Sequence, residues 1–220
     1  MMEFNGILSL LFASIELVFV VNLLFFAEKN YINMLVMLLI FILGVYQVYE
    51  FLICFFGMNV SSVVYCAILA ISFMPPLGLF IALRLKNFNS KYWYLIFLPA
   101  LFFVVYFPLV VDQFHATFCT VLYASIHYPL GIYYAAVYYL PIVISLIMYW
   151  DLAKSESHPK RKASLKLIRN GFFLTFIPAA LLFFLVPQTV IAVESILCKI
   201  AFVLALYLFL FALKFKAQYE

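Results

Sequence analysis

Charged side chains are scarce in this chain: 10% of the 220 residues are Asp, Glu, Lys or Arg, whereas 69% are hydrophobic. Soluble domains carry about 25% charged residues and about 45–50% apolar ones. This shortage excludes a water-soluble globular core and leaves no room for a soluble catalytic domain. We therefore expect a single membrane domain over residues 1–220, with the lipid bilayer as its first partner.

Residue types that carry chemistry are also few. The four cysteines form no Cys-x-x-Cys pair, and the three histidines have no His-x-x-x-His spacing, so no zinc, haem or redox motif is indicated. His-Glu-x-x-His and Gly-x-Ser-x-Gly are missing as well. We expect no enzyme, no metal and no cofactor. The net charge of +4 comes from basic loops, so we expect no nucleic-acid partner.

The beginning of the chain lacks the marks of a cleaved signal. The opening MMEFN has no basic region, and the apolar run after it ends without a small-x-small cleavage site. We therefore expect this run to remain as the first membrane span.

Seven apolar segments are separated by short polar links. Each is about 20 residues long, which is the length that crosses a hydrocarbon core as a helix. The predicted fold is an all-α polytopic membrane protein, a bundle of seven transmembrane helices. The predicted spans are 6–27, 31–56, 62–83, 92–111, 131–152, 168–186 and 190–213.

Basic residues predict the orientation of this bundle, because a seven-span path places nearly all of them on one side. They are Arg84, Lys86 and Lys91, the cluster from Lys154 to Arg169, and Lys214 and Lys216. The opposite links, 57–59, 112–115 and 188–189, contain no Lys or Arg. The positive-inside rule then predicts an outside N-terminus and a cytoplasmic C-terminus. We expect a multi-pass protein of the cell membrane, in bacteria the inner membrane.

Segment 113–130 could be an eighth membrane span, since it is nearly long enough to cross the bilayer. A span here would place the two basic clusters on opposite sides, so we predict an outer, partly interfacial or re-entrant loop instead. Cys66 and Cys119 both fall near the outer face in this topology. We expect them to be small buried hydrophobic side chains, with a disulfide between them as the alternative.

Prolines are frequent inside the predicted spans, and each removes a backbone hydrogen bond and bends its helix. Such bends open space between helices and favour a cavity, although proline is also simply common in membrane helices. The prolines are Pro75, Pro76, Pro99, Pro108, Pro141 and Pro178.

Two ionisable residues fall near the middle of the membrane. A charge at this depth costs about 2.5–3.5 kcal/mol on insertion scales, so it is expected to face a partner or a wet cavity. At a rise of ~1.5 Å per residue, Glu16 in the first span and Lys199 in the seventh lie at matching depths. The first and last helices of a ring are neighbours, which predicts a buried Glu16–Lys199 ion pair. Its role is either functional or only to lock these two spans together.

A second polar group lies nearer the outer face. Tyr46, Gln47, Glu50 and Cys54 share one helical face of the second span, and Glu194 lies at a similar depth in the seventh. Two carboxylates with no cation beside them can share a proton, bind a cation or hold the amine of a ligand. The alternative is a protonated Glu50 that bonds to Gln47 or to a backbone carbonyl.

Two further residues complete the predicted outward-facing ligand cavity. Tyr138 lies a turn or two inside the fifth span, where its hydroxyl needs a partner; packing is its simpler role. His127 belongs to the outer loop and makes that loop polar or pH-responsive.

The order of these motifs is familiar. A Glu closes the polar face of span two (YQVYEF), a diproline breaks span three (SFMPPLGLFIAL), and prolines recur in spans four (LIFLPALFF) and six (FFLTFIPAALL). With PLGIYY before span five, the chain resembles the seven-span sensory region at the N-terminus of some bacterial histidine kinases. It is also similar to bacterial seven-span proteins with Gln-x-x-Glu in span two, here Gln47 and Glu50.

That resemblance implies sensing of a ligand or of the membrane state. Since this chain carries no kinase or cyclase domain, we expect a signalling partner protein. Lys199 also occupies the position at which rhodopsins bind retinal, but Trp93 and Trp150 lie near span ends and the tryptophans that sandwich retinal are missing. The leading hypothesis is therefore a receptor-like module for a small molecule or lipid. The alternative is a proton- or cation-coupled transporter or channel, although no inverted repeat is evident.

Overall fold

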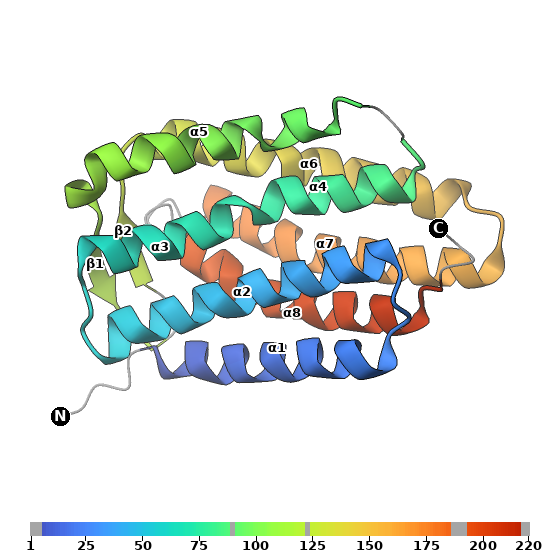
Figure 1. Ribbon diagram of the computed structural model, residues 1–220, viewed down its shortest axis with the longest axis horizontal. Coiled ribbons are helices and arrows are strands. Elements are labelled where there is room, and N and C mark those ends of the chain that lie inside the picture. The colour runs from blue at the N-terminus through green and yellow to red at the C-terminus, as the bar shows by residue number, and fades with distance from the viewer. Residues whose placement is uncertain (1–5, 89–90, 122–123, 186–192, 217–220) are drawn as a thin grey trace.

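The computed structural model describes residues 6–88, 91–121, 124–185 and 193–216, and its helices run along one long axis (Figure 1). The first half of the chain contains α1 (Ile7–Phe26), α2 (Tyr31–Phe55), α3 (Ser61–Ser72) and α4 (Met74–Leu85). The second half contains η1 (Trp93–Phe97), α5 (Leu98–Tyr106), η2 (Phe107–Gln113), α6 (Gly131–Ser155), α7 (Pro159–Leu185) and α8 (Val193–Lys214). Two short strands, β1 (His115–Cys119) and β2 (Ala124–His127), lie between η2 and α6.

The described residues form seven helical rods, because α3 continues into α4 and the three pieces η1, α5 and η2 follow one another. Six of these rods are long and apolar enough to cross a membrane. The remaining rod, α7, has a strongly basic first part and an apolar second part. Large apolar side chains also cover the outside of the bundle, for example Phe25 at 79% exposed and Ile132 at 86% exposed. The chain is therefore an all-α polytopic membrane protein.

Proline determines where the third rod breaks. The second half-helix, α4, begins at Met74 and holds Pro75 and Pro76 in its first turn, where a missing backbone N–H is tolerated. The predicted break at this diproline is confirmed. Pro141 and Pro178, in contrast, lie inside the continuous helices α6 and α7. The cavities beside Pro75 and Pro141 each have a volume of only about 20 Å³, so these prolines open little space.

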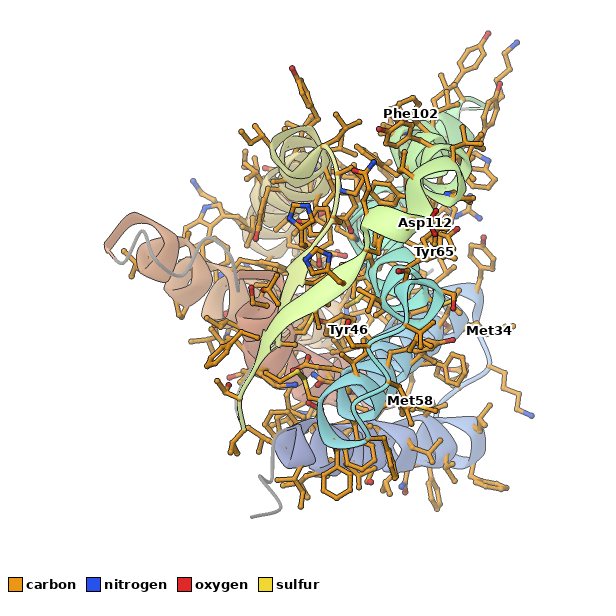
Figure 2. All side chains as sticks on the ribbon, turned by 90° about the vertical axis from the view of Figure 1, so that its left-hand side faces the viewer. Met34, Tyr46, Met58, Tyr65, Phe102 and Asp112 are labelled. Carbon is orange, nitrogen blue, oxygen red and sulfur yellow. A yellow bond between two sulfur atoms is a disulfide. The ribbon has the colours of Figure 1, made fainter. Side chains whose placement is uncertain are left out.

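The described residues of segment 113–130 form no helix long enough to cross a membrane. The strands β1 and β2 pair as an antiparallel hairpin, with His115 opposite His127, and the hairpin crosses one end of the bundle (Figure 2). The side chain of Asn59 donates to the carbonyl of Ala116 (2.8 Å) and accepts from its N–H (2.7 Å). This amide thus satisfies the free edge of β1. The predicted outer loop is therefore a β-hairpin, an element that the all-α prediction did not contain.

The disulfide of this protein joins Cys54 at the end of α2 to Cys119 in β1. The considered pairing of Cys66 with Cys119 is wrong, because Cys66 is a free thiol. Treating both cysteines as simple hydrophobic side chains was also wrong for Cys119. The hairpin brings Cys119 across to α2, a path that residue spacing alone does not reveal.

Helix packing places α2 near the centre of the bundle. It contacts α1, α3, α4 and α8, and α1 also packs against α8. The predicted contact between the first and last spans is therefore confirmed. We call the end of the bundle that carries β1 and β2 the hairpin end. Every Lys and Arg except Lys199 belongs to the opposite end or to the adjoining turns of its helices.

Candidate functional site

Five buried or nearly buried polar side chains from three helices meet near the hairpin end. Gln47 and Glu50 are three residues apart in α2, and Ser195 and Lys199 are four apart in α8, so each pair lies on one helical face. Ser9, in the first turns of α1, completes the group. We call these five residues the outer polar cluster. It forms here because α1, α2 and α8 all contact one another.

Lys199 and Glu50 form a buried ion pair at the centre of this cluster. Lys199 Nζ lies 3.0 Å from Glu50 Oε1, with the Lys199 side chain 11% exposed and the Glu50 side chain 1% exposed. The same ammonium donates to Ser9 Oγ and to Gln47 Oε1, both at 2.6 Å. An ammonium has three N–H donors, so every donor of Lys199 has an acceptor. The charge is thus held in one place by three helices.

The cluster continues to the backbone of the hairpin. Ser195 Oγ donates to Glu50 Oε1 (3.0 Å) and accepts from the N–H of Ala124 at the start of β2 (3.0 Å). Gln47 Nε2 donates to the backbone carbonyl of Cys198 in α8 (3.0 Å). An unbroken path of hydrogen bonds therefore leads from the hairpin through Ser195 to the ion pair.

The start of α1 and the hairpin are also joined directly. The N–H of Gly6 donates to the carbonyl of Thr120 at 3.0 Å, next to the Cys54–Cys119 disulfide. Gly6 has φ +76°, and a Cβ at this position would lie 3.0 Å from Cys54 Cβ. Only glycine tolerates both the positive φ and the close approach to Cys54 without strain. The hairpin end is therefore built around a close approach of three chain segments.

Glu16 is not in the cluster, and the predicted Glu16–Lys199 ion pair is not formed. Glu16 interacts with Lys199 only electrostatically, and neither of its carboxylate oxygens has a hydrogen-bond partner among the described residues. The reason is the direction of the side chains. A helical Cβ tilts toward the N-terminus, which carries the Lys199 ammonium toward the hairpin end and Ser9. Ser9 lies two turns, about 10 Å, from Glu16 along α1.

The remaining predicted ligand residues are not brought into one cavity. Tyr46 is fully buried in the core. Tyr138 packs between the rings of Tyr134 and Tyr139, with centroids 5.8 and 5.4 Å away. His127 is exposed on the hairpin, its ring 5.0 Å from that of His115. Glu194 belongs to α8, but its side chain lies outside the described part of the chain.

Lys199 also changes the interpretation of Glu50. The sequence-based hypothesis placed Glu50 beside a second carboxylate with no cation nearby, whereas the structure gives it a cation in direct contact. Its other oxygen, Oε2, has no hydrogen-bond partner in the described structure.

Two residues of the outer polar cluster were missed in the sequence. Ser9 and Ser195 look like ordinary small residues of apolar helices. The signal that would have identified Ser195 is its position four residues before Lys199, which puts both on one face. Ser9 has no such signal, because its partner lies on another helix.

Chemically, the cluster holds one ammonium beside one carboxylate among hydroxyl and amide groups. Within the described residues, no group of three or more His, Cys, Asp or Glu side chains is placed to hold a metal ion. Comparison with protein-family models, curated proteins and solved structures gave no match.

Proposed function

We propose that this chain is a seven-span receptor-like protein of the cell membrane, with its N-terminus outside and its C-terminus in the cytoplasm. Its hairpin end meets the ligand, and the outer polar cluster carries the effect into the helices. Two independent features support this orientation. Lys and Arg gather at the end opposite the hairpin, as expected of a cytoplasmic face. The Cys54–Cys119 disulfide lies at the hairpin end, and disulfides persist in oxidising compartments outside the cytoplasm.

The observation that carries the proposal is the hydrogen-bonded path from Ala124 through Ser195 and Glu50 to Lys199. A ligand that moves β2 pulls on Ser195 and thereby on α8. Helix shifts of about 1–2 Å are a common means of transmitting a signal. Since α8 ends at Lys214, on the basic side, its displacement reaches the cytoplasmic face, where a partner protein can respond.

We propose that the ligand contacts the hairpin end rather than an outward-facing cavity between Glu50 and Tyr138. The cavities lined by Tyr138 hold about 20 Å³ each, whereas small-molecule pockets hold about 300–1,000 Å³. A small molecule or lipid headgroup that binds across β1 and β2 needs no such cavity.

The test measures thermal unfolding of the full chain in nanodiscs, in the presence of a defined panel of water-soluble amines, carboxylates and sugars. A ligand at 100 times its Kd stabilises the folded state by about 2.7 kcal/mol, so a binder raises the midpoint. The proposal expects a binder for which Lys199→Met removes most of this stabilisation, whereas Lys214→Met keeps it. A binder that stabilises both variants equally would contradict the proposed coupling.

The alternative function is a proton- or cation-coupled transporter or channel. One observation favours it: Lys199 interacts electrostatically with two carboxylates, Glu50 and Glu16, which is an arrangement that can pass a proton. Liposomes that contain the protein and a pH-sensitive dye separate the two functions. The receptor proposal expects no flux under a pH or sodium gradient. A flux that Glu50→Gln abolishes would establish transport instead.

A further inference from the structure

One sizeable cavity lies outside the outer polar cluster. It is a groove of about 470 Å³ between α1 and α2, open at the side of the bundle. This volume falls within the range of about 300–1,000 Å³ that small-molecule sites occupy. Its walls are apolar side chains that include Leu17, Val20, Phe41 and Val48.

The floor of this groove contains a carboxylate without a partner. Glu16 lines the groove, is 0% exposed, and has no hydrogen bond to either oxygen in the part of the chain that the structure describes. The other polar lining side chain from α1, Ser14, is already used, because its hydroxyl donates to the carbonyl of Leu10 at 2.8 Å. A buried polar group without hydrogen bonds is costly. Of these two side chains of α1, Glu16 is therefore the one that calls for a ligand with a donor.

A glycine of the neighbouring helix lies beside this carboxylate. A Cβ built on Gly44 of α2 would lie 3.5 Å from Glu16 Oε2, which is ordinary contact distance. A larger side chain at position 44 would occupy the groove beside the carboxylate. Gly44 thus lets the Glu16 carboxylate lie against α2 with no side chain of position 44 between them.

The position of the groove limits what can enter it. Glu16 is the tenth residue of the 20-residue helix α1, so it lies near the middle of the span. The rims are exposed apolar side chains, for example Leu17 at 57% and Phe41 at 49% exposed, and in a polytopic protein these face lipid tails. An occupant must therefore arrive through the bilayer, and it must itself be lipophilic.

We infer that this groove binds a lipophilic amine, that is, an apolar body that carries an ammonium head, with the head on Glu16. An ammonium supplies both the opposite charge and the hydrogen-bond donors that the carboxylate lacks. A fatty acid would bring a second negative charge, and a plain hydrocarbon would leave both oxygens of Glu16 without a partner. This inference is independent of the hairpin and of the coupling proposed above.

The test uses photolabelling of the full chain in nanodiscs with a diazirine derivative of dodecylamine. Labelled peptides are mapped by mass spectrometry, and unlabelled dodecylamine serves as the competitor. We expect labels in both α1 and α2 along the groove. The labelling should fall about tenfold in Glu16→Gln, and it should also fall in Gly44→Val, which keeps the carboxylate but fills the space. Asp112→Asn, which removes a carboxylate at the hairpin end, is the matched control and should label as the wild type does.

Non-reducing electrophoresis checks that each variant still forms the Cys54–Cys119 disulfide and so has an assembled hairpin end. Three results would overturn the inference. One is labelling that is equal in Glu16→Gln and wild type. Another is equal labelling of the groove by a dodecanoic acid probe, which would mean that the groove takes any acyl chain. The third is protection of the groove by a second copy of the chain, seen as a crosslinked dimer without label in α1.

Discussion

Lys199 contacts three other residues of the outer polar cluster. Its ammonium contacts Glu50, Ser9 and Gln47, so one side chain holds α1, α2 and α8 together. The pair is nearly excluded from water, and replacing one member leaves the other charge buried without compensation. A single replacement in this pair should therefore lower the free energy of unfolding more than replacing both residues does.

We predict that Lys199→Met lowers the free energy of unfolding by about 3–5 kcal/mol. The double variant Glu50→Leu/Lys199→Met should be less destabilised than Lys199→Met alone, because it leaves no unpaired charge. The measurement is reversible unfolding in mixed detergent micelles.

The exposed pair Lys86–Asp151 is the control for this experiment. Its atoms are also 3.0 Å apart, but the side chains are 50% and 58% exposed. Removing such a surface pair costs about 0–1 kcal/mol. If Lys199→Met lowered the free energy of unfolding no more than Lys86→Met does, the buried ion pair would not stabilise the fold, and this prediction would be wrong.

At the scale of the element, the hairpin explains why three segments meet at one end of the bundle. It is fixed by the Cys54–Cys119 disulfide, by Asn59 on the edge of β1 and by the bond from Gly6 to Thr120. Each attachment comes from a different helix or link. Three attachments thus tie the hairpin to the helix ends beneath it.

We predict that Cys54→Ser destabilises the protein by about 2–4 kcal/mol, because the lost disulfide closes a long loop of the unfolded chain. Cys66→Ser, which changes a free thiol, should leave the unfolding midpoint of the oxidised protein unchanged. Unfolding curves with and without reductant provide the measurement. Equal effects of the two substitutions would show that the disulfide does not hold the hairpin end.

Some of these elements were predictable and others were not. The diproline of α4 predicts the break between α3 and α4, because proline is tolerated in the first turn of a helix and disrupts a helix interior. The hairpin has no such mark: its residues are apolar enough for a span, and the pairing of His115 with His127 depends on contacts made across a turn. The disulfide was missed for the same reason, since β1 determines which cysteine Cys119 can reach.

The candidate functional site was also predictable only in part. The polar face of Gln47 and Glu50 follows from helical periodicity. The predicted pairing of Lys199 with Glu16 was wrong, because Lys199 contacts Glu50. Which carboxylate it contacts was not predictable from depth alone. Side-chain direction moves the ammonium toward the hairpin end, so Glu50 becomes the partner and Glu16 is left facing the groove.

For the molecule as a whole, the proposed orientation places the hairpin outside and the basic end in the cytoplasm. We predict that Met58→Cys, in the link between α2 and α3, reacts with a membrane-impermeant maleimide in intact cells. Phe88→Cys, in the link after α4, should react only after permeabilisation. Both positions are exposed, at 47% and 54%, so a difference in labelling reports the side of the membrane. Labelling of Phe88→Cys in intact cells would place this link outside the cell and contradict the proposed orientation.

We propose that the hairpin and the buried Glu50–Lys199 pair form one coupled unit. Amide hydrogen exchange of residues 115–127, measured in nanodiscs, tests it most directly. We predict that Lys199→Met speeds exchange in this segment about tenfold, equivalent to about 1.4 kcal/mol, whereas Lys214→Met has no effect. Identical exchange of the hairpin in both variants and in the wild type would contradict the account.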